Sequence, residues 1–327
     1  MRILITGATG FVGGHLIERL RRDGENELFG LSRRAVWPDV RRHLAGQLTL
    51  HSVDLLRPFE LERVLREIKP NQIYHLAGYA NTGQSFLEPT KAWEGNGLAT
   101  FQLYEAINRA GIRPRILFAS SGLVYGNPAS GGEHLCVETD ELRPASPYAS
   151  SKAAADLLSY QASCHPGLSV VRIRCFNQIG PGQSAGFACP DFARQIAAIE
   201  AGRQPPLLET GDLSAQRDLT DVRDMVRAFV LLMEHGVKGE AYNAGSGTTH
   251  SIRTLLDRLL AQARCRVEVR ERRDSSRSSD TPISRADVRK LHAATGWTPK
   301  YSFDQTLADV LDDWRQRTAS QGSNDAA

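Results

Sequence analysis

The sequence lacks the features that mark several large classes of protein. Its five cysteines among 327 residues form no CxxC pair and no cysteine–histidine spacing suited to zinc, so no metal site is expected. The net charge is only +3 and the arginines are scattered along the chain, which argues against nucleic-acid binding. No apolar run approaches the length that spans a membrane, so a membrane partner is not expected either.

The remaining composition is that of an ordinary globular protein. Hydrophobic residues make up 41% of the sequence and charged residues 24%, enough for one large domain or two closely packed ones. Residues 1–5 run directly into a glycine turn, which favours a buried strand over a signal peptide. Together with thiols that show no sign of pairing, this predicts a cytoplasmic protein.

The first half of the sequence alternates short apolar runs with helical stretches. Strands are predicted at residues 3–6, 28–31, 48–52, 72–76, 116–119 and 169–174, and helices near 11–23, 61–69, 92–110 and 147–163. Parallel strands need such helical crossovers, so we expect an α/β fold built on a doubly wound parallel sheet.

This rhythm breaks after Cys175. A Gly-Pro-Gly-Gln turn at 180–183 precedes predicted helices near 192–201, 221–234, 252–263 and 303–317 and a short strand at 241–243. The composition of 272–280 predicts a flexible linker, and that of 319–327 predicts a frayed end.

A glycine-rich turn stands between the first predicted strand and the first predicted helix. Gly7, Gly10 and Gly13, together with Phe11 and Val12, fit the dinucleotide-binding fingerprint in its required strand–turn–helix setting. The glycines let the backbone approach a pyrophosphate, and the start of the helix offers N–H groups and the positive end of its dipole. The turn therefore predicts a dinucleotide site, although a glycine triplet alone can be only a tight turn.

The second predicted strand ends in Ser32-Arg33-Arg34, without the acid that commonly binds the ribose 2′-hydroxyl of NAD. A hydroxyl and an arginine fork suit a phosphate, so we expect NADP(H), with NAD(H) left open. The two arginines can also be surface charges and nothing more. Asp54, at the end of the third strand, can contact the adenine amino group or cap a helix.

Tyr148 and Lys152 are four residues apart, which places them on one helix face. A free tyrosine, with a pKa near ~10, is a poor acid or base at neutral pH, and a nearby cation lowers that pKa. A lone YxxxK pair usually marks only a solvated helix face. Here Ser120-Ser121 and the glycine turn precede it.

In this order, the glycine turn, Ser121 and the Tyr148/Lys152 pair resemble the extended short-chain dehydrogenase/reductases over nearly the whole chain. The other matching elements are His75-Leu76-Ala77-Gly78, Asn96, Val124-Tyr125-Gly126, Phe176-Asn177, Arg217-Asp218 and Gly296-Trp297-Thr298-Pro299. The resemblance implies a dinucleotide-binding Rossmann domain at residues 1–175, to which segments near 219–245 return. It implies a mainly substrate-binding domain at 176–327 and a nucleotide-linked sugar as substrate.

By the same resemblance, Tyr148 is the catalytic acid/base, Lys152 bonds the nicotinamide ribose and lowers the Tyr148 pKa, and Ser121 bonds the reacting oxygen. The resemblance also implies that Asn177 and Arg217 face the substrate diphosphate. Without it, Asn177 can be a loop residue that bonds its own backbone, and Arg217 can form a surface ion pair with Asp218. Further cofactor contacts are expected from Asp54, Leu55, Leu76, Ala77 and Gly78, and sugar contacts from Gln84 and Ser85, which can equally bond within their own loop.

Three reactions of this family remain to be distinguished. Sugar-nucleotide 4,6-dehydratases carry an acid two residues after the catalytic serine or threonine, where this sequence has Leu123, which cannot transfer a proton. A 4-epimerase holds NAD tightly and has little need of NADP, so Arg33 and Arg34 favour a 4-keto reductase. The 4-epimerase is the alternative, and a GDP-mannose 4,6-dehydratase is the second alternative.

Several stretches closely resemble GDP-4-keto-6-deoxy-D-mannose reductases, namely residues 176–184, 191–196, 217–224 and 277–282. In the last of these, Arg277 and Asp280 form an Arg-Ser-x-Asp pattern in place of the usual Arg-Pro-x-Glu, and the shorter carboxylate can still bind ribose hydroxyls. The expected reaction is the NADPH-dependent reduction of a GDP-linked 4-keto-6-deoxy sugar to GDP-D-rhamnose or a close relative. Helices near 92–110 and 147–163 commonly pair between subunits in this family, so a homodimer is expected.

Overall fold

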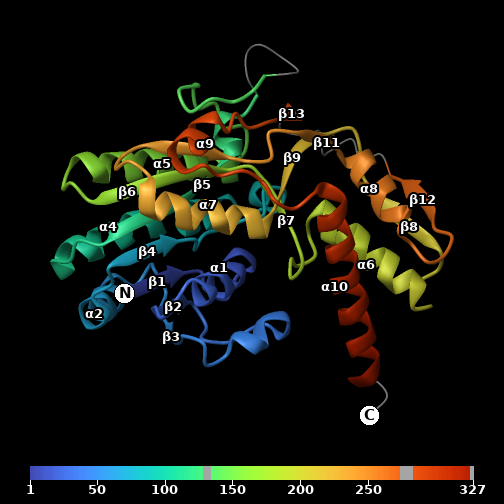
Figure 1. Ribbon diagram of the computed structural model, residues 1–327, viewed down its shortest axis with the longest axis horizontal. Helices are drawn as coiled ribbons and strands as arrows, with labels where there is room; N and C mark the ends of the chain where they lie inside the picture. The colour runs from blue at the N-terminus through green and yellow to red at the C-terminus, as the bar shows by residue number, and fades with distance from the viewer. Residues whose placement is uncertain (128–133, 273–282, 325–327) are drawn as a thin grey trace.

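The computed structural model describes residues 1–127, 134–272 and 283–324. A seven-stranded sheet in the order β10-β6-β5-β4-β1-β2-β3 forms its centre, and every neighbouring pair in it is parallel (Figure 1). The strands are β1 (Arg2–Thr6), β2 (Glu27–Ser32), β3 (Thr49–Ser52), β4 (Gln72–His75), β5 (Arg115–Ser121), β6 (Ser169–Cys175) and β10 (Ala241–Ala244).

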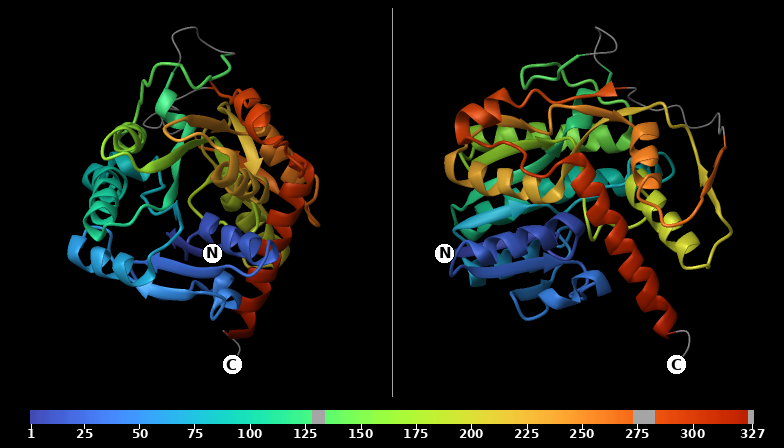
Figure 2. Two further views of the ribbon diagram at one scale, coloured as in Figure 1. Left: turned by 60° about the vertical axis from the view of Figure 1, so that its left-hand side comes forward. Right: turned by 45° about the vertical axis from the view of Figure 1, so that its right-hand side comes forward.

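Helices cover both faces of this sheet (Figure 2), because side chains point alternately to its two sides. In β1, Ile3 and Ile5 join one apolar core, and Leu4 joins the other. The first core includes α1 (Phe11–Arg22), α7 (Val222–His235) and α9 (Arg289–Thr295), and the second includes α2 (Pro58–Ile68), α4 (Ala99–Ala110) and α5 (Pro147–Cys164). The predicted doubly wound α/β fold is confirmed.

A smaller group of strands and helices lies beside the large sheet (Figure 1). Its central strand β9 (Gln216–Asp221) pairs in parallel with β7 (Asn177–Ile179) and β13 (Ile283–Ser284) and antiparallel with β11 (Thr249–Ser251). A separate parallel pair joins β8 (Leu207–Thr210) to β12 (Glu268–Glu271). The apolar core of this part is built from α6 (Ala188–Glu200), α8 (Ile252–Leu260) and α10 (Phe303–Asn324).

The large sheet also contains a strand, β10, that follows Cys175 in the sequence. After β9, helix α7 packs against α1, and β10 then adds the edge strand beside β6, with Ala241 opposite Arg172. The short connecting elements are η1 (Asp39–Leu44), η2 (Gln84–Phe86), α3 (Pro89–Ala92), η3 (Trp93–Leu98) and η4 (Gly122–Tyr125). In the described part of the chain, no helix is both long enough and apolar enough to cross a membrane.

The prediction of one helix at 92–110 is wrong for the first part of this stretch. The π-helical turn η3 connects α3 to α4, so the stretch is not one regular α-helix. Within η3, the buried Asn96 side chain accepts a hydrogen bond from the Tyr79 N–H and donates one to Ser151 Oγ, both at 2.9 Å. These bonds to other segments hold a turn that helix propensity alone does not predict.

The end predicted to fray from residue 319 also needs correction, because α10 continues to Asn324. Asp313 accepts a hydrogen bond from the Gly182 N–H at 2.9 Å, and Arg317 donates one to the Gln183 carbonyl at 3.1 Å. These contacts hold the second half of α10 against the loop at 180–183. Most of the linker predicted at 272–280 lies outside the described residues.

Candidate functional site

The glycine turn has the shape of a cradle for an anionic group. Gly7 has a φ of +72°, and a Cβ there would lie 2.9 Å from the Ala77 nitrogen, so only glycine fits between β1 and β4. The Gly7 N–H donates to the Leu31 carbonyl at 2.9 Å, which fixes the turn against the end of β2. Helix α1 begins at Phe11 with no acid in its first turn, so its N-terminal dipole is not offset by a carboxylate there.

The end of β2 lies next to this turn. Ser32 Oγ is 2.9 Å from Thr9 Oγ1, and Ser32 and Arg33 both line the cleft described below. Arg34 lies outside that lining. Asp54 also lies outside it and accepts a hydrogen bond from the Leu56 N–H at 3.0 Å, so its side chain stabilises the turn before α2.

A cleft of about 910 Å³ connects the glycine turn with the smaller group of strands. It brings together residues that are far apart in the sequence and that the sequence analysis selected as site residues. They are Gly7, Gly10, Phe11, Val12, Gly13, Ser32, Arg33, Leu55, Leu76, Ala77, Gly78, Gln84, Ser121, Tyr148, Asn177 and Arg217. Arg277 and Asp280 lie outside the described residues.

Ser85 is adjacent to the cleft but is buried behind its wall. Its hydroxyl donates to the Thr82 carbonyl at 2.6 Å and accepts a hydrogen bond from the Tyr148 N–H at 3.2 Å. The Ser85 side chain therefore bonds within its own loop, which is one of the two roles expected from the sequence, and it also connects that loop to the start of α5.

Ser121 and Tyr148 meet in the middle of the cleft. Ser121 is the last residue of β5, and Tyr148 lies in the first turn of α5, which Ser146 caps by accepting from the Ala149 N–H at 3.2 Å. The Ser121 hydroxyl accepts a hydrogen bond from the Leu123 N–H at 3.2 Å and is also hydrogen-bonded to the Tyr148 phenol. The hydroxyl and the phenol thus face the same space.

Lys152 lies one turn further along α5, buried beneath the cleft. Its Nζ donates to the Ala119 carbonyl at 2.9 Å. Burial lowers the pKa of Lys152 to about 8, an effect opposed by the carboxylate of Asp156, which favours the charged form. Burial raises the pKa of Tyr148, and the hydrogen bond from Ser121 only partly opposes this.

The expected lowering of the Tyr148 pKa by Lys152 is therefore not found. The reason is that burial disfavours the phenolate more than the surrounding groups stabilise it. A proton accordingly stays on the phenol at neutral pH.

Sequence reasoning missed the buried ion-pair network below Lys152. Asp156, fully buried one turn after Lys152, accepts from Arg172 Nη1 at 2.5 Å and from Arg174 Nη2 at 3.1 Å. Arg174 Nη1 also donates to the Tyr125 hydroxyl at 2.9 Å. The only sequence signal was a third polar residue at helical spacing after Tyr148 and Lys152.

The far side of the cleft is formed by the smaller group of strands. Asn177 and Arg217 come from the neighbouring strands β7 and β9, which explains how residues 40 positions apart reach one surface. Arg217 also donates through Nη1 to the Gln216 carbonyl at 2.8 Å. Phe187 and Asp191 line this side too, at the beginning of α6.

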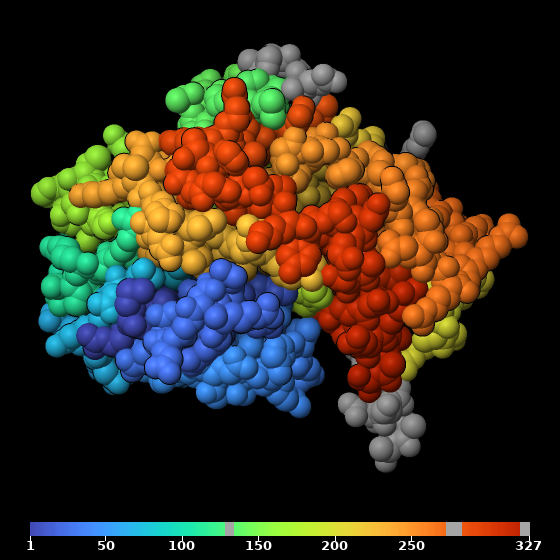
Figure 3. All heavy atoms as spheres, viewed as in Figure 1, coloured from blue at the N-terminus to red at the C-terminus, as the bar shows by residue number. Residues whose placement is uncertain are grey.

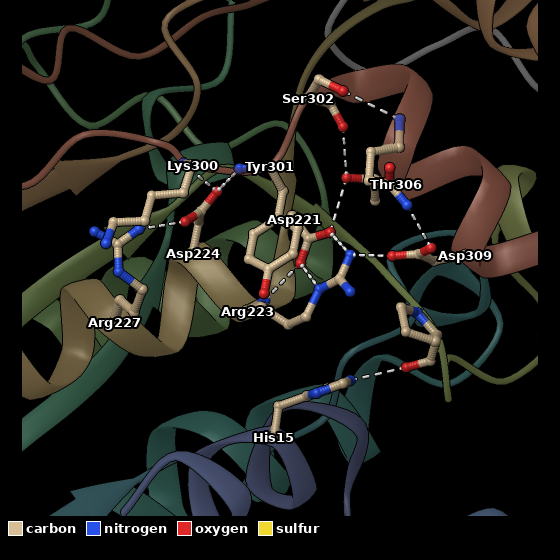
Figure 4. A network of polar contacts seen from close by, with 12 residues as sticks. His15, Asp221, Arg223, Asp224, Arg227, Lys300, Tyr301, Ser302, Thr306 and Asp309 are labelled. Carbon is tan, nitrogen blue, oxygen red and sulfur yellow. Dashed lines mark hydrogen bonds and ion pairs between the residues drawn. The ribbon is translucent and has the colours of Figure 1, made fainter. Parts of the chain in front are cut away.

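Polar contacts join the two sides of the molecule around this cleft (Figure 4). His15 on α1 lies 2.8 Å from the Pro181 carbonyl, which belongs to the loop at 180–183. Asp221, at the start of α7, accepts hydrogen bonds from Arg223 Nη2 at 2.6 Å and from Thr306 Oγ1 at 2.8 Å. Arg223 also pairs with Asp309 at 2.6 Å, so α7 and α10 are held together.

The described residues contain no cluster of three or more histidine, cysteine, aspartate or glutamate side chains that could hold a metal ion. The chemistry available at this site is that of a hydroxyl, a phenol and an ammonium group beside a cradle for a dinucleotide.

Comparison with known proteins identifies the family. The family model described as GDP-mannose 4,6 dehydratase matches residues 4–310. The chain belongs to the extended short-chain dehydrogenase/reductases that modify sugar nucleotides. As a member of this family it is an NAD(P)-dependent enzyme, and the resemblance found in the sequence is confirmed.

Two kinds of family member are similar to it at almost the same level. The GDP-6-deoxy-D-mannose reductase of Pseudomonas aeruginosa is 33% identical over 98% of this chain and 99% of its own length. The structure of RMD from P. aeruginosa complexed with NADPH superposes with a TM-score of 0.84, at 34% identity, covering 97% of this chain and 99% of that one. The Thermus thermophilus UDP-glucose 4-epimerase complex with NAD gives a TM-score of 0.85, at 31% identity, covering 96% and 99%.

Proposed function

We propose that this protein uses NADPH to reduce the C4 keto group of a GDP-linked 4-keto-6-deoxy sugar, giving GDP-D-rhamnose or a close relative. The observation that carries the proposal is the end of β2, where Ser32 and Arg33 line the cleft at the place at which NAD-binding folds commonly have an acid. A hydroxyl and a guanidinium suit the 2′-phosphate of NADPH. A reductase needs this freely exchanging cofactor, whereas an epimerase re-uses bound NAD.

The proposed cofactor contacts follow the walls of the cleft. Gly7, Gly10 and Gly13 let the backbone approach the pyrophosphate, with Phe11 and Val12 in the first turn of α1. Leu55, Leu76, Ala77 and Gly78 line the path toward Tyr148. We assign residues 1–175, with 219–245, mainly to cofactor binding and the rest of 176–327 mainly to substrate binding.

NADPH, when bound, supplies a hydride to the sugar C4. Tyr148 donates its proton to the C4 oxygen as that oxygen gains charge, and the raised pKa of Tyr148 keeps the proton available at neutral pH. Because the Leu123 N–H donates to Ser121 Oγ, the Ser121 hydroxyl hydrogen is left to point at the phenol or at the reacting oxygen. The Lys152 ammonium group donates one N–H to the Ala119 carbonyl. Its two other N–H groups are proposed to donate toward the nicotinamide ribose and toward Tyr148.

The substrate's diphosphate is proposed to lie between Asn177 and Arg217, with Gln84 near the sugar hydroxyls. Leu123 supports reduction over dehydration, because it lines the cleft two residues after Ser121 and cannot transfer the proton that elimination requires. Arg277 and Asp280 are proposed as contacts to the nucleotide from the segment that precedes β13.

The test is an NADPH-oxidation screen over a small panel of 4-keto-6-deoxy sugar nucleotides, with the C4 configuration of the product determined by NMR. Tyr148→Phe is expected to lower the rate about 10²- to 10⁴-fold while NADPH still binds, since only the proton donor is lost. Tyr301→Phe, which removes the hydroxyl of a partly exposed tyrosine outside the cleft lining, is the matched control and is expected to retain the rate. Full activity of Tyr148→Phe would show that the assigned acid is wrong.

The second candidate is a nucleotide-sugar 4-epimerase, which the similarity to the T. thermophilus enzyme favours. NAD that stays bound through purification, together with turnover of a UDP- or GDP-sugar without added NADPH, would establish it and overturn the reductase.

We also propose that two copies of the chain associate through α4 and α5. These helices pack side by side, and each exposes large apolar side chains that a second copy would cover. The side chains are Leu98, just before α4, Phe101 on α4, and Leu157 and Tyr160 on α5.

A further inference from the structure

Lys152 is a positive charge in a buried site. Only 7% of its surface is exposed, its Nζ donates to the Ala119 carbonyl at 2.9 Å, and the centre of the Phe118 ring lies 5.5 Å from Nζ. A carbonyl and an aromatic ring replace only part of the water that an ammonium group loses on burial. The charged form of Lys152 therefore depends on the other groups that surround it.

The titratable side chains packed directly around Lys152 are mostly neutral at neutral pH. On β4, His75 is fully buried, and burial lowers its pKa to about 3. On β6, burial raises the pKa of the Cys175 thiol to about 12, and on α5 burial raises the pKa of Tyr148. Asn96 on η3 carries no charge. None of these groups supplies a negative charge that would stabilise the ammonium group.

Asp156 does supply one, one turn later on the same face of α5. Its side chain is completely buried. Burial alone would raise the pKa of Asp156, but the hydrogen bonds from Arg174 and the charges of Arg174 and Arg172 hold that pKa below its usual value. Asp156 is therefore ionised, and its charge acts on Lys152 through a medium from which water is excluded.

Two arginines on β6 share this carboxylate. Arg174 donates through Nη2 to Asp156 Oδ1 at 3.1 Å and through Nε to Oδ2 at 3.2 Å. Arg172 donates through Nη1 to Oδ1 at 2.5 Å. With Lys152, three buried cations thus surround one buried anion.

The other titratable side chains around the two arginines do not take the place of Asp156. Tyr104 on α4 and Tyr125 on η4 are phenols whose pKa burial raises. The Glu138 side chain accepts a hydrogen bond from the backbone of β10 at 2.7 Å, and that of Glu240 pairs with a lysine on α9 at 2.6 Å. Both of these acids are engaged away from Lys152.

Removal of the Asp156 charge would therefore leave three positive charges close together. Arginine does not lose its proton in proteins, whereas a buried lysine readily does. The repulsion would be relieved by loss of the Lys152 proton.

We propose that Asp156 is a positioning residue that keeps Lys152 positively charged and thereby sets the highest pH at which the enzyme works. Asp156 lies outside the cleft lining, so it acts through Lys152 and not on a ligand. Its effect on the reaction rests on the proposed function, in which the charged Lys152 binds the nicotinamide ribose. Its effect on the charge of Lys152 does not.

The charge of Lys152 can be measured without turnover. The sequence contains only six lysines, and the other five are exposed or half-buried, so full-length protein labelled with ¹³C at the lysine ε-carbons gives few NMR signals. Lys152→Arg removes one signal and thereby assigns it. In the wild-type protein this signal is expected to titrate with a midpoint at about pH 8. Exposed lysines titrate at about pH 10.4.

Asp156→Asn keeps the size of the side chain and removes its charge. It is expected to weaken proton binding by Lys152 at least about tenfold, which moves the NMR midpoint to a lower pH. A general loosening of the fold would do the opposite, because water would stabilise the ammonium group. Asp224→Asn is the matched control and should leave the midpoint in place. Asp224 is also completely buried, pairs with an arginine on its own helix and lies outside the cleft lining (Figure 4).

Arg172→Met removes one cation from the same carboxylate and is expected to move the midpoint to a higher pH. This variant keeps the test decisive if circular dichroism shows that Asp156→Asn does not fold. A midpoint that stays in place or rises in Asp156→Asn overturns the proposal. A midpoint that stays in place or falls in Arg172→Met does the same.

Initial rates of NADPH oxidation between pH 6 and 10 test the consequence for the reaction. In Asp156→Asn the alkaline decline of kcat/KM should move to lower pH together with the NMR midpoint, and a decline that stays in place while the midpoint moves overturns this second part. A shifted midpoint in a protein without reductase activity sinks the proposed reaction alone. Reductase activity with both the midpoint and the decline untouched by Asp156→Asn sinks this inference alone.

Discussion

Burial acts on Tyr148 and Lys152 in the same sense, since it favours the neutral form of each side chain. For the phenol this raises the pKa, and for the ammonium group it lowers the pKa to about 8. Of the two proposed catalytic groups, Lys152 is thus the one that titrates closest to neutral pH. Tyr148 keeps its proton over the range in which Lys152 loses one.

The pH dependence of reduction should follow Lys152. Lysine is charged below its pKa, so in the free enzyme the cationic form that binds the nicotinamide ribose is lost as the pH rises through about 8. We expect kcat/KM for NADPH-dependent reduction to fall above pH about 8, which initial-rate measurements between pH 6 and 10 would show. In Lys152→Arg, whose side chain stays charged, any remaining activity should lack this decline. A decline that persists unchanged in that variant contradicts the assignment to Lys152.

At the scale of elements, the loop at 180–183 connects the cofactor side of the cleft to α10. Arg41 on η1 is only 4% exposed and lies between α1 and this loop, with Nη1 3.2 Å from Glu18 Oε1. Two glycines make room for it, because a Cβ at Gly14 would lie 2.5 Å from Arg41 Nε and a Cβ at Gly182 would overlap the guanidinium. Gly182 also has a φ of +85°, which side-chain-bearing residues rarely adopt.

Gly182→Ala is therefore expected to lower the free energy of unfolding by about 1–3 kcal/mol, from backbone strain and the displacement of Arg41. The substrate KM should rise as well, because the neighbouring Gln183 and Ser184 line the cleft. Urea unfolding measures the first effect and initial rates the second. Gly211→Ala is the control, since a Cβ there meets nothing within 4 Å, and it should change the free energy of unfolding by less than about 0.5 kcal/mol. Equal effects of the two substitutions would rule out the role of Gly182.

The secondary-structure elements differ in how well the sequence alone predicts them. The central strands of the large sheet were predictable because they are runs of mostly buried apolar residues, as in β1, and the glycine turn was predictable because its geometry is local. The strands β12 and β13 were not, since β12 is mostly exposed and β13 has only two residues. The π-helical turn η3 and the last part of α10 depend on contacts with distant segments, which no local pattern contains. The role of Ser85 was undecidable for the same reason.

At the scale of the whole molecule, the exposed apolar face of α4 and α5 predicts the oligomeric state. Leu157→Glu places a charge where a second copy would bury an apolar side chain, so a dimer should become a monomer by light scattering. Phe59→Glu is the matched control, because Phe59 on α2 is 82% exposed and lies outside this face. Wild-type protein that is already monomeric, or a Leu157→Glu variant that stays dimeric, would show that this face is not the interface.

The space-filling view shows the last helix, in red, on the near face of the molecule, between the blue N-terminal part and the orange segment that contains α8 (Figure 3). Asp313 on this helix accepts a hydrogen bond from the Gly182 N–H, which lies 131 residues earlier in the chain. Gly182 belongs to the loop at 180–183, and Arg41 and His15 contact this loop from the other side. A ribosome delivers the chain in order, so the glycine turn and β1–β6 leave it long before Asp313 does. The cofactor side of the cleft can consequently assemble during synthesis, whereas the loop on the substrate side gains its last anchor only when α10 has emerged.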